Sequence, residues 1–461
     1  MSMLGGCSTT SVHEISVKQK SNKKIVKSKK IKKTTIVKSS NKEHSLDVSD
    51  LKFFPQYTQA YEDNIQAHNK YLQVQKHYSD KYFEPWKYRK PPYTKQGVLW
   101  PFSSYTYEKS YGENLQAIPK SWFDDMFKLA NFKEYGSLNK KAISLNYLNV
   151  RNFPTSKPVF KDPSQAGEGF PFDYMQNSGI YANEPLFVSH LSENGQWAYI
   201  FTSYVTGWVK LKDIAFLNNK VITSFKNAQL ITITDEFYPI KDLEGNFVFN
   251  SRVGMRLPLI SIKKDYYIVL AITQNKNHTP SYTKVKIPFY IGSKNKLKLN
   301  KNNFKHIIDL MLQSKYGWGG LYEQRDCSSM LRDLYAPFDI WLPRNSSQQS
   351  KIGRVISLEG LSLEAKKEKI ISKAIPFETL LYKKGHILLY LGVYKGKITV
   401  LHDMWGIRTL ENEKEGRRIL GKTVISSLSL GKEQKNYNEE SGLLEKILSM
   451  NIITELSQDI Q

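Results

Sequence analysis

Cys327 lies where a cysteine can act as a nucleophile. It follows Arg325-Asp326 and directly precedes residues 328–335, an amphipathic run that predicts a helix stopped by Pro337. The unpaired N–H groups and the dipole at a helix N-terminus favour an anion, so a thiol there can have its pKa lowered to about 3.5–7.5. The alternative is an ordinary buried cysteine, but the Gly-rich segment before it and the serines after it favour the chemical role.

A nucleophilic cysteine needs a base, and two of the nine histidines lie on a predicted hairpin beyond it. His386 opens one apolar run, His402 closes the next, and a turn signal separates them. A two-residue loop would place the two rings on opposite faces of the hairpin. A three-residue loop at residues 394–396 would pair residue 402 with residue 388 and bring both rings to one face, about 7–8 Å apart at the backbone. We predict the three-residue loop, because one histidine can then orient the other.

The segments around these residues predict a domain of mixed helix and strand over residues 295–461. An amphipathic helix is expected over residues 304–312, and the two histidines lie on strands at 386–393 and 397–403. Apolar residues recur at helical spacing over 439–457, which predicts a C-terminal amphipathic helix.

The chain before this domain divides into three parts. Short alternating runs separated by turn signals fill residues 139–222 and recur over 223–294, which predicts two consecutive small β-barrels. Residues 50–138 are rich in Tyr, Pro and Lys, with helical stretches expected near 58–78 and 119–131. We therefore predict that residues 50–138 form a segment that wraps against the later domains.

Length, cysteine content and charge exclude several classes of protein. At about 100–200 residues per domain, 461 residues predict two to four domains. The two cysteines lie far apart in the sequence, which excludes a disulfide framework and zinc sites built from clustered cysteines. No metal-ligand spacing appears, so no cofactor is expected. The net charge of +24 suits any polyanion and does not choose among them.

The N-terminus carries a motif and a tether. Leu4-Gly5-Gly6-Cys7 resembles a bacterial lipobox, in which Cys7 would be lipidated, so residues 1–7 are interpreted as a lipobox remnant. A signal peptide needs an apolar stretch of about 7–15 residues, and only six residues precede Cys7. Two interpretations stay open: the true start lies upstream, or the match is fortuitous. Residues 8–49 are rich in Ser, Thr and Lys and predict a disordered basic tether.

Five short motifs stand out in the last domain: Tyr316-Gly-Trp-Gly-Gly320, Arg325-Asp-Cys-Ser-Ser329, Leu342-Pro-Arg-Asn-Ser346, Gly385-His-Ile-Leu-Leu-Tyr390 and Leu401-His402. Together they resemble the NlpC family of papain-like murein endopeptidases. The similarity covers about residues 50–430, and upstream motifs resemble the bacterial SH3-like domains of a multidomain branch. The resemblance implies an α+β chain in which a wrapping segment and two SH3-like β-barrels precede a papain-like cysteine peptidase domain.

The family resemblance implies hydrolysis of the γ-D-glutamyl–diaminopimelate bond in peptidoglycan stem peptides, through an acyl-enzyme. Cys327 is then the nucleophile, His386 the general base and His402 the orienting third member. The residues implied to hold the L-Ala-γ-D-Glu part of the substrate are Tyr316, Asp326 and Ser328.

Four further residues are weaker candidates for substrate binding. Arg344 and Asn345 match the family motif, and Arg344 meets either a substrate carboxylate or, as we favour, a structural ion pair. In the branch with two SH3-like domains, the first such domain narrows the cleft and favours peptides with a free N-terminal L-Ala. Asp173 and Glu168 are the candidates for the acid that binds this amine.

Other functions remain as alternatives. A catalytically inactive peptidoglycan-binding module would keep the fold, but it should have lost a member of the Cys–His–His set. Acyl transfer or amide synthesis would use the same residues. Nucleic-acid binding rests only on the basic tail and is not expected. The murein substrate implies export to the cell envelope or periplasm, with a membrane partner only through a lipid anchor at Cys7, as in an outer-membrane lipoprotein.

Overall fold

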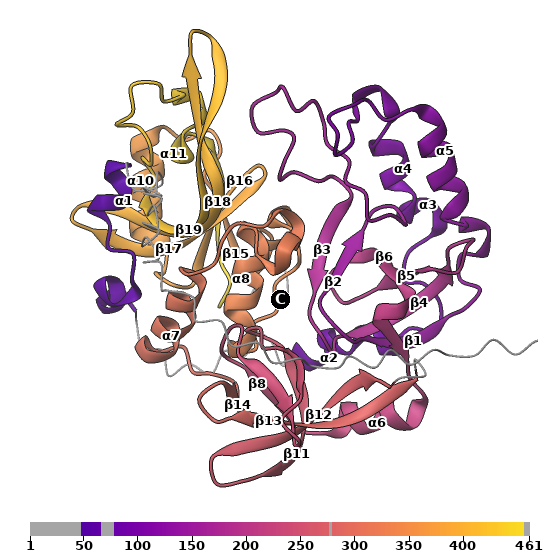
Figure 1. Ribbon diagram of the computed structural model, residues 1–461. Helices are drawn as coiled ribbons and strands as arrows, with labels where there is room; N and C mark the ends of the chain where they lie inside the picture. The colour runs from indigo at the N-terminus through magenta and orange to yellow at the C-terminus, as the bar shows by residue number, and fades with distance from the viewer. Residues whose placement is uncertain (1–47, 66–77, 276–278, 456–461) are drawn as a thin grey trace, which may run out of the picture. The chain divides into compact units, whose positions relative to one another are not determined.

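Three antiparallel β-sheets follow one another along the chain in the computed structural model, which describes residues 48–65, 78–275 and 279–455. The first two sheets have seven strands each and the third has six (Figure 1). The helices are short and lie mainly in the N-terminal part and around the third sheet.

The first sheet has the strand order β3-β2-β6-β5-β4-β1-β7. Every residue of β5 is buried, because both faces of this strand are covered. Ala198 and Ile200 point into the interior of the domain, whereas Tyr199 and Phe201 pack on the opposite face against Phe132 of the N-terminal part. The strands are β1 (Lys140–Ser144), β2 (Leu148–Arg151), β3 (Gln176–Ile180), β4 (Pro185–Leu191), β5 (Trp197–Phe201), β6 (Thr206–Lys210) and β7 (Ile214–Phe216).

The N-terminal part is a series of short helices. The helix predicted near 119–131 is confirmed as α5 (Lys120–Leu129). The stretch predicted near 58–78 is instead a 3-10 helix, η2 (Thr58–Asn64), and residues 66–77 lie outside the described residues. The other elements are α1 (Ser49–Phe53), α2 (Tyr78–Tyr82), η4 (Glu84–Lys87), α3 (Lys95–Val98), α4 (Trp100–Ser104), η5 (Tyr107–Lys109) and η6 (Phe132–Glu134).

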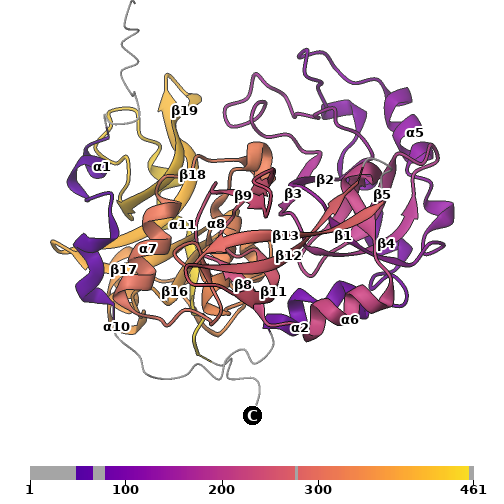
Figure 2. The ribbon, with the colours of Figure 1, turned by 60° about the horizontal axis from the view of Figure 1, so that its bottom comes forward.

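The second sheet has the order β10-β9-β13-β12-β11-β8-β14 and a core of aliphatic residues. Helix α6 (Asn219–Asn227) joins it to the first sheet and packs beside α2, with Phe225 in the same apolar cluster as Tyr82 (Figure 2). The strands are β8 (Leu230–Ile233), β9 (Pro239–Asp242), β10 (Phe247–Asn250), β11 (Arg256–Ile262), β12 (Tyr266–Gln274), β13 (Pro280–Pro288) and β14 (Gly292–Ser293).

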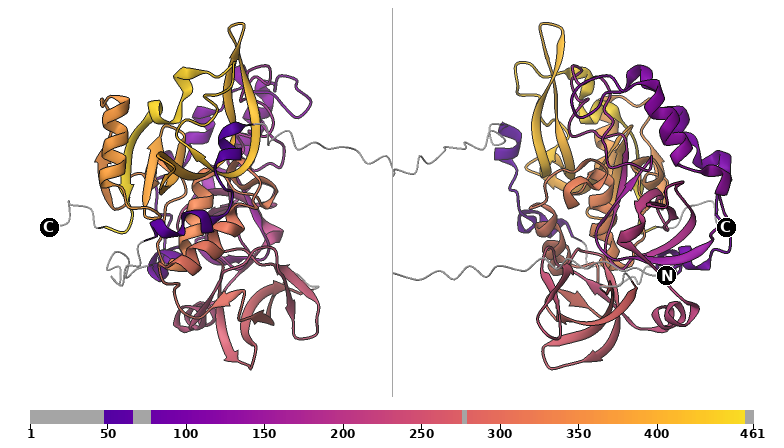
Figure 3. Two further views of the ribbon diagram at one scale, coloured as in Figure 1. Left: turned by 90° about the vertical axis from the view of Figure 1, so that its left-hand side faces the viewer. Right: turned by 45° about the vertical axis from the view of Figure 1, so that its right-hand side comes forward.

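The third sheet, of order β15-β20-β16-β17-β18-β19, packs against two helices that contribute to one large apolar cluster. Residues 48–65 run along its strands β17 and β19, as Figure 3 shows. The strands are β15 (Arg354–Ser357), β16 (Thr379–Lys383), β17 (His386–Tyr394), β18 (Lys397–Glu411), β19 (Lys414–Ser427) and β20 (Ile447–Ile452). The helices are α7 (Lys301–Met311), η8 (Trp318–Glu323), α8 (Cys327–Tyr335), η9 (Ala336–Phe338), α9 (Ser346–Gln349), α10 (Leu363–Lys373), η10 (Glu439–Ser441) and α11 (Leu443–Lys446).

The predicted C-terminal helix over 439–457 is wrong. Of its described residues, only η10 (Glu439–Ser441) and α11 (Leu443–Lys446) are helical, and β20 (Ile447–Ile452) follows α11 at once. This strand lies between β15 and β16, so its backbone is paired on both sides. A short apolar run fits both the helical and the strand spacing of apolar residues, and here the pairing with β15 and β16 favours the strand.

Candidate active site

The sequence places Cys327 at the first position of α8. Asp326 is the N-cap: its carboxylate accepts from the backbone N–H of Ser329 at 2.9 Å, and the Ser329 hydroxyl accepts from the backbone N–H of Asp326 at 2.9 Å. This capping box ties down the first turn of the helix. The thiol therefore sits on a rigid element at the mouth of a pocket.

The two histidines meet because of a β-bulge, and the predicted three-residue loop is wrong. Tyr394 pairs with Lys397, which leaves a two-residue turn at Lys395-Gly396, both with positive φ. This turn alone would separate the rings. The register shifts between Tyr390 and Gly392, and Leu389 pairs with Leu401 beyond the shift. The bulge thus restores the register that the sequence analysis attributed to the loop.

The hydrogen bonds of the two histidines form a chain in which each group donates to the next. His386 Nε2 lies 2.9 Å from His402 Nδ1, and His402 Nε2 lies 2.9 Å from Ser426 Oγ. Ser426 donates its hydroxyl hydrogen to the carbonyl of Ser427 at 3.0 Å, so it must accept from His402. His402 Nδ1 then accepts from His386 Nε2–H. This assignment leaves Nδ1 of His386 as the unprotonated nitrogen that can take up a proton.

Burial keeps the thiol and both imidazoles neutral. Loss of solvent raises the pKa of Cys327 to about 12, Asp326 adds to the rise, and the backbone N–H of Ile387 opposes it. The expected lowering by the helix N-terminus is therefore wrong, because the loss of solvent and the nearby carboxylates outweigh it. Burial, and next the ring of His402, hold the pKa of His386 well below 6.5. Burial also lowers the pKa of His402 to about 3.

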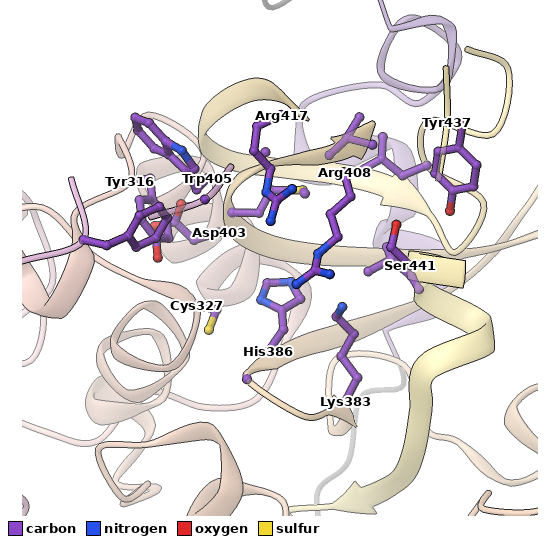
Figure 4. A pocket seen from close by; sticks show the side chains of 18 residues that line it. Tyr316, Cys327, Lys383, His386, Asp403, Trp405, Arg408, Arg417, Tyr437 and Ser441 are labelled. Atoms are coloured by element: carbon purple, nitrogen blue, oxygen red, sulfur yellow. The ribbon is translucent and has the colours of Figure 1, made fainter. Parts of the chain in front are cut away.

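The pocket in front of Cys327 has a volume of about 280 Å³. Tyr316 and His386 line it (Figure 4). His402, the hydrogen-bond partner of His386, is fully buried and does not line the pocket. Burial, followed by the charge of Asp326, raises the pKa of Tyr316 well above 10, so its hydroxyl remains a hydrogen-bond donor.

Asp326, Ser328 and Arg344 form a cluster behind the thiol. Arg344 makes a bidentate ion pair with Asp326, with nitrogen–oxygen distances of 3.0 and 2.6 Å, and donates to Ser328 Oγ at 3.0 Å. Burial would raise the pKa of Asp326, but Arg344 and the Ser329 hydrogen bonds outweigh it and lower the pKa. Arg344 Nε also donates to Ser178 Oγ of β3 at 2.7 Å, which links the cluster to the first sheet.

The Gly-rich motif at residues 316–320 is a contact with the first sheet. A Cβ on Gly319 would lie 2.8 Å from the carbonyl oxygen of Gln176, and a Cβ on Gly320 would lie 2.6 Å from the Tyr147 hydroxyl. The indole of Trp318 donates to the carbonyl of Asp173 at 3.0 Å. The glycines are required by this close approach and by positive φ at both positions.

Three of the weaker candidates lie outside the pocket. Asn345 is the N-cap of α9 and accepts from the backbone of Gln348 at 2.9 Å. Asp173 is buried in an ion pair with Arg151 at 2.6 Å, and Glu168 accepts from Tyr174 at 2.7 Å. The loop that carries both acids does reach the site, because Gly167 and Phe172 line the pocket.

The sequence analysis did not identify most of the pocket lining. Lys383, Asp403, Trp405, Arg408 and Arg417 all face the pocket (Figure 4). The last four belong to the hairpin of β18 and β19, which is much longer than the predicted strands. The alternation along that hairpin could have revealed the two arginines.

Two searches of the structure gave no candidates. Within residues 48–65, 78–275 and 279–455, no three His, Cys, Asp or Glu side chains are grouped so that they could hold a metal ion. The helices of these same ranges include none with the length and apolar character needed to cross a membrane. Cys7 and the proposed tether lie outside the described residues, apart from its last two.

Three family models match parts of the chain. Residues 2–135 match the N-terminal NLPC_P60 stabilising domain, residues 158–210 match an SH3 domain of the SH3b1 type, and residues 313–424 match the NlpC/P60 family. A search of the curated proteins found no match.

Two solved structures are similar to this chain. An NlpC/P60 endopeptidase from Photobacterium damselae subsp. piscicida is 24% identical, with a TM-score of 0.76 over 87% of this chain and 98% of that one. An NlpC/P60 family protein from Bacillus cereus is 16% identical, with a TM-score of 0.43 over 68% of this chain and 99% of that one. The first of these likenesses shows that the two chains share a fold.

Proposed function

Since residues 313–424 belong to the NlpC/P60 family, we propose that the chain is a cysteine endopeptidase acting on peptidoglycan stem peptides. The proposed reaction is hydrolysis of the γ-D-glutamyl–diaminopimelate bond. The observation that carries the proposal is the meeting of Cys327 and His386 in one pocket, with His402 2.9 Å behind His386. The set of nucleophile, base and orienting group is complete.

The protonation of the site defines the first step. A neutral thiol attacks the scissile carbonyl carbon while Nδ1 of His386 takes up its proton. The C–N bond then breaks, and His386 returns the proton to the departing amine, which leaves an acyl-enzyme on Cys327. In the second step His386 removes a proton from water as the water oxygen attacks the acyl carbon. The C–S bond then breaks, and His386 returns the proton to the departing sulfur. His402 and Ser426 hold the imidazole in the required tautomer throughout.

Digestion of two substrates tests the proposal. The full chain is incubated with L-Ala-γ-D-Glu-diaminopimelate and with intact murein sacculi, and the products are identified by mass spectrometry. We expect release of L-Ala-γ-D-Glu, and its loss in Cys327→Ala. Preference for the free tripeptide indicates peptide recycling, and attack on sacculi indicates wall remodelling. No cleavage of either substrate, with retained binding to sacculi, supports the inactive binding module instead.

The proposed substrate also defines the proposed location. Peptidoglycan lies outside the cytoplasmic membrane, so we propose that the protein acts in the cell envelope. Cys7 is the residue that a lipid anchor would modify. Mass spectrometry of the native N-terminus tests the anchor, since an unmodified Met1 or Ser2 contradicts it.

A further inference from the structure

Three cationic side chains face the pocket beside the catalytic pair. They are Lys383 of β16, Arg408 of β18 and Arg417 of β19 (Figure 4). The two arginines pair directly across the hairpin and share the carboxylate of Glu415, at 3.4 and 2.6 Å. Like charges directly opposite each other in a sheet are unfavourable, so an excess of positive charge at this point has a cost.

Lys383 is the least compensated of the three. Among the residues that the structure describes, it has no hydrogen-bond or ion-pair partner. Burial, followed by the charges of Arg408 and Lys446, lowers its pKa. A half-buried cation without a counter-ion is costly unless an anion binds beside it.

The position of the cations relative to Cys327 identifies which half of a substrate they meet. The imidazole that removes the thiol proton must return it to the departing amine, so the leaving half of the substrate lies on the His386 side of the sulfur. Lys383 is the register partner of His386 in the β16–β17 pair. Figure 4 shows Lys383 and Arg408 on this side, with Tyr316 and Trp405 on the other.

The remaining charges on the pocket wall agree with this division. Asp403 also lines the pocket, but it lies on the Tyr316 side of Cys327 (Figure 4). Arg417 packs against the first sheet's loop, where a Cβ on Gly167 would lie 2.6 Å from its guanidinium. Arg408 is more exposed than Arg417, at 55% against 15% of its side chain. Lys383, which has no ion-pair partner among the described residues, and Arg408, which is the more exposed arginine, are therefore the two cations best placed to meet a ligand.

We propose that Lys383 and Arg408 form a carboxylate subsite for the amine half that leaves on cleavage. The inference rests on the proposed function and adds a specificity determinant to it. The ligand chemistry is a carboxylate on the leaving amino acid. It comes from one of two sources: the distal carboxylate of a diamino acid, or the free C-terminal carboxylate of the peptide.

Four peptides separate the two sources. The full chain is given L-Ala-γ-D-Glu-X, where X is diaminopimelate or lysine, each with a free or an amidated C-terminus. A distal-carboxylate subsite favours diaminopimelate over lysine when both C-termini are amidated. A C-terminal subsite favours the free acid over the amide when X is lysine. A charge-assisted contact predicts a preference of about 10-fold to 100-fold in kcat/KM, expressed mainly in KM.

Lys383→Met tests the residue, and Lys384→Met is the matched control on its exposed neighbour. We expect the preference to fall to within a few-fold in Lys383→Met, to be kept in Lys384→Met, and to be largely restored in Lys383→Arg. An equal loss of kcat for all four peptides in Lys383→Met overturns the subsite. A role of Lys383 in the fold or at the thiol would slow all four peptides to the same extent, whatever their leaving group. Cleavage by the wild type without any preference overturns it too. Cleavage of no peptide overturns the proposed function as well.

Discussion

At the proposed catalytic residues, burial favours neutral groups over a preformed thiolate–imidazolium pair. The pKa of Cys327 is about 12 and that of His386 lies well below 6.5. His386 must be neutral to accept the thiol proton, and its lowered pKa keeps it neutral as the pH falls. We therefore predict that kcat/KM falls on the acid side only well below pH 6.5. Alkylation of Cys327 by iodoacetamide should keep rising through pH 9, because the thiolate fraction is still increasing.

The rate of alkylation between pH 5 and pH 10 reports the pKa of the Cys327 thiol. The acid side of the kcat/KM profile reports the pKa of His386. Cys327→Ala gives the background alkylation. A plateau in the alkylation rate near pH 7 would contradict this prediction, because it would show that the thiol already ionises there.

The bulge in β17 is the feature of an element on which the site depends. Gly392 has a φ of +108°, and a Cβ added to it would lie 2.4 Å from Nδ2 of Asn64. Asn64 donates to the carbonyl of Leu391, the extra residue of the bulge, at 2.9 Å. Gly392→Ala should therefore combine backbone strain with a clash. We predict a fall of about 2–4 kcal/mol in the free energy of unfolding, and lower kcat because the histidines lose register.

Urea unfolding and peptide hydrolysis measure both effects. Gly195→Ala is the control, since Gly195 also has positive φ, at +69°, but has no atom near its Cβ position. It should lose only about 1 kcal/mol and keep its activity. A variant of Gly392 with wild-type kcat would show that the bulge does not hold the catalytic register.

The same strand shows how much could be predicted from the sequence. Local spacing was enough to predict that Cys327 begins a helix and that His386 and His402 lie on one hairpin. The prediction of a three-residue loop that aligns the two histidines was wrong. The bulge is fixed by Asn64, more than 300 residues away in the sequence, so no local pattern could reveal it. The strand β20 was missed for a related reason, since its pairing with β15 and β16 is not local.

At the scale of the whole described body, buried ion pairs connect the loop before Cys327 to both preceding sheets. Arg325, 1% exposed, pairs with Glu236 of the second sheet's domain and with Asp333 of α8 at 2.7 Å. Asp333 in turn accepts from the hydroxyl of Tyr181 beside β3. Arg252 completes the network at 2.7 Å from Glu236. The residue two positions before Cys327 is therefore held by all three sheet regions, which couples their stability to the site.

Glu236→Gln tests this coupling through its pH dependence. Burial alone would raise the pKa of Glu236, but Arg325 and Arg252 hold it below its ordinary value of 4.5. A lowered pKa contributes stability that is fully present above pH 4.5 and is lost as the pH falls through the folded-state pKa.

The Glu236→Gln variant should lose about 2–4 kcal/mol of its free energy of unfolding at pH 7, because two buried guanidiniums then lack one negative charge. This deficit should shrink steadily in urea unfolding below pH 4.5. Asp124→Asn, which breaks the exposed pair with Lys120, should leave the free energy of unfolding nearly unchanged. A Glu236→Gln deficit that is the same at pH 3 and pH 7 would mean that side-chain shape, and not charge, connects the loop before Cys327 to the sheets.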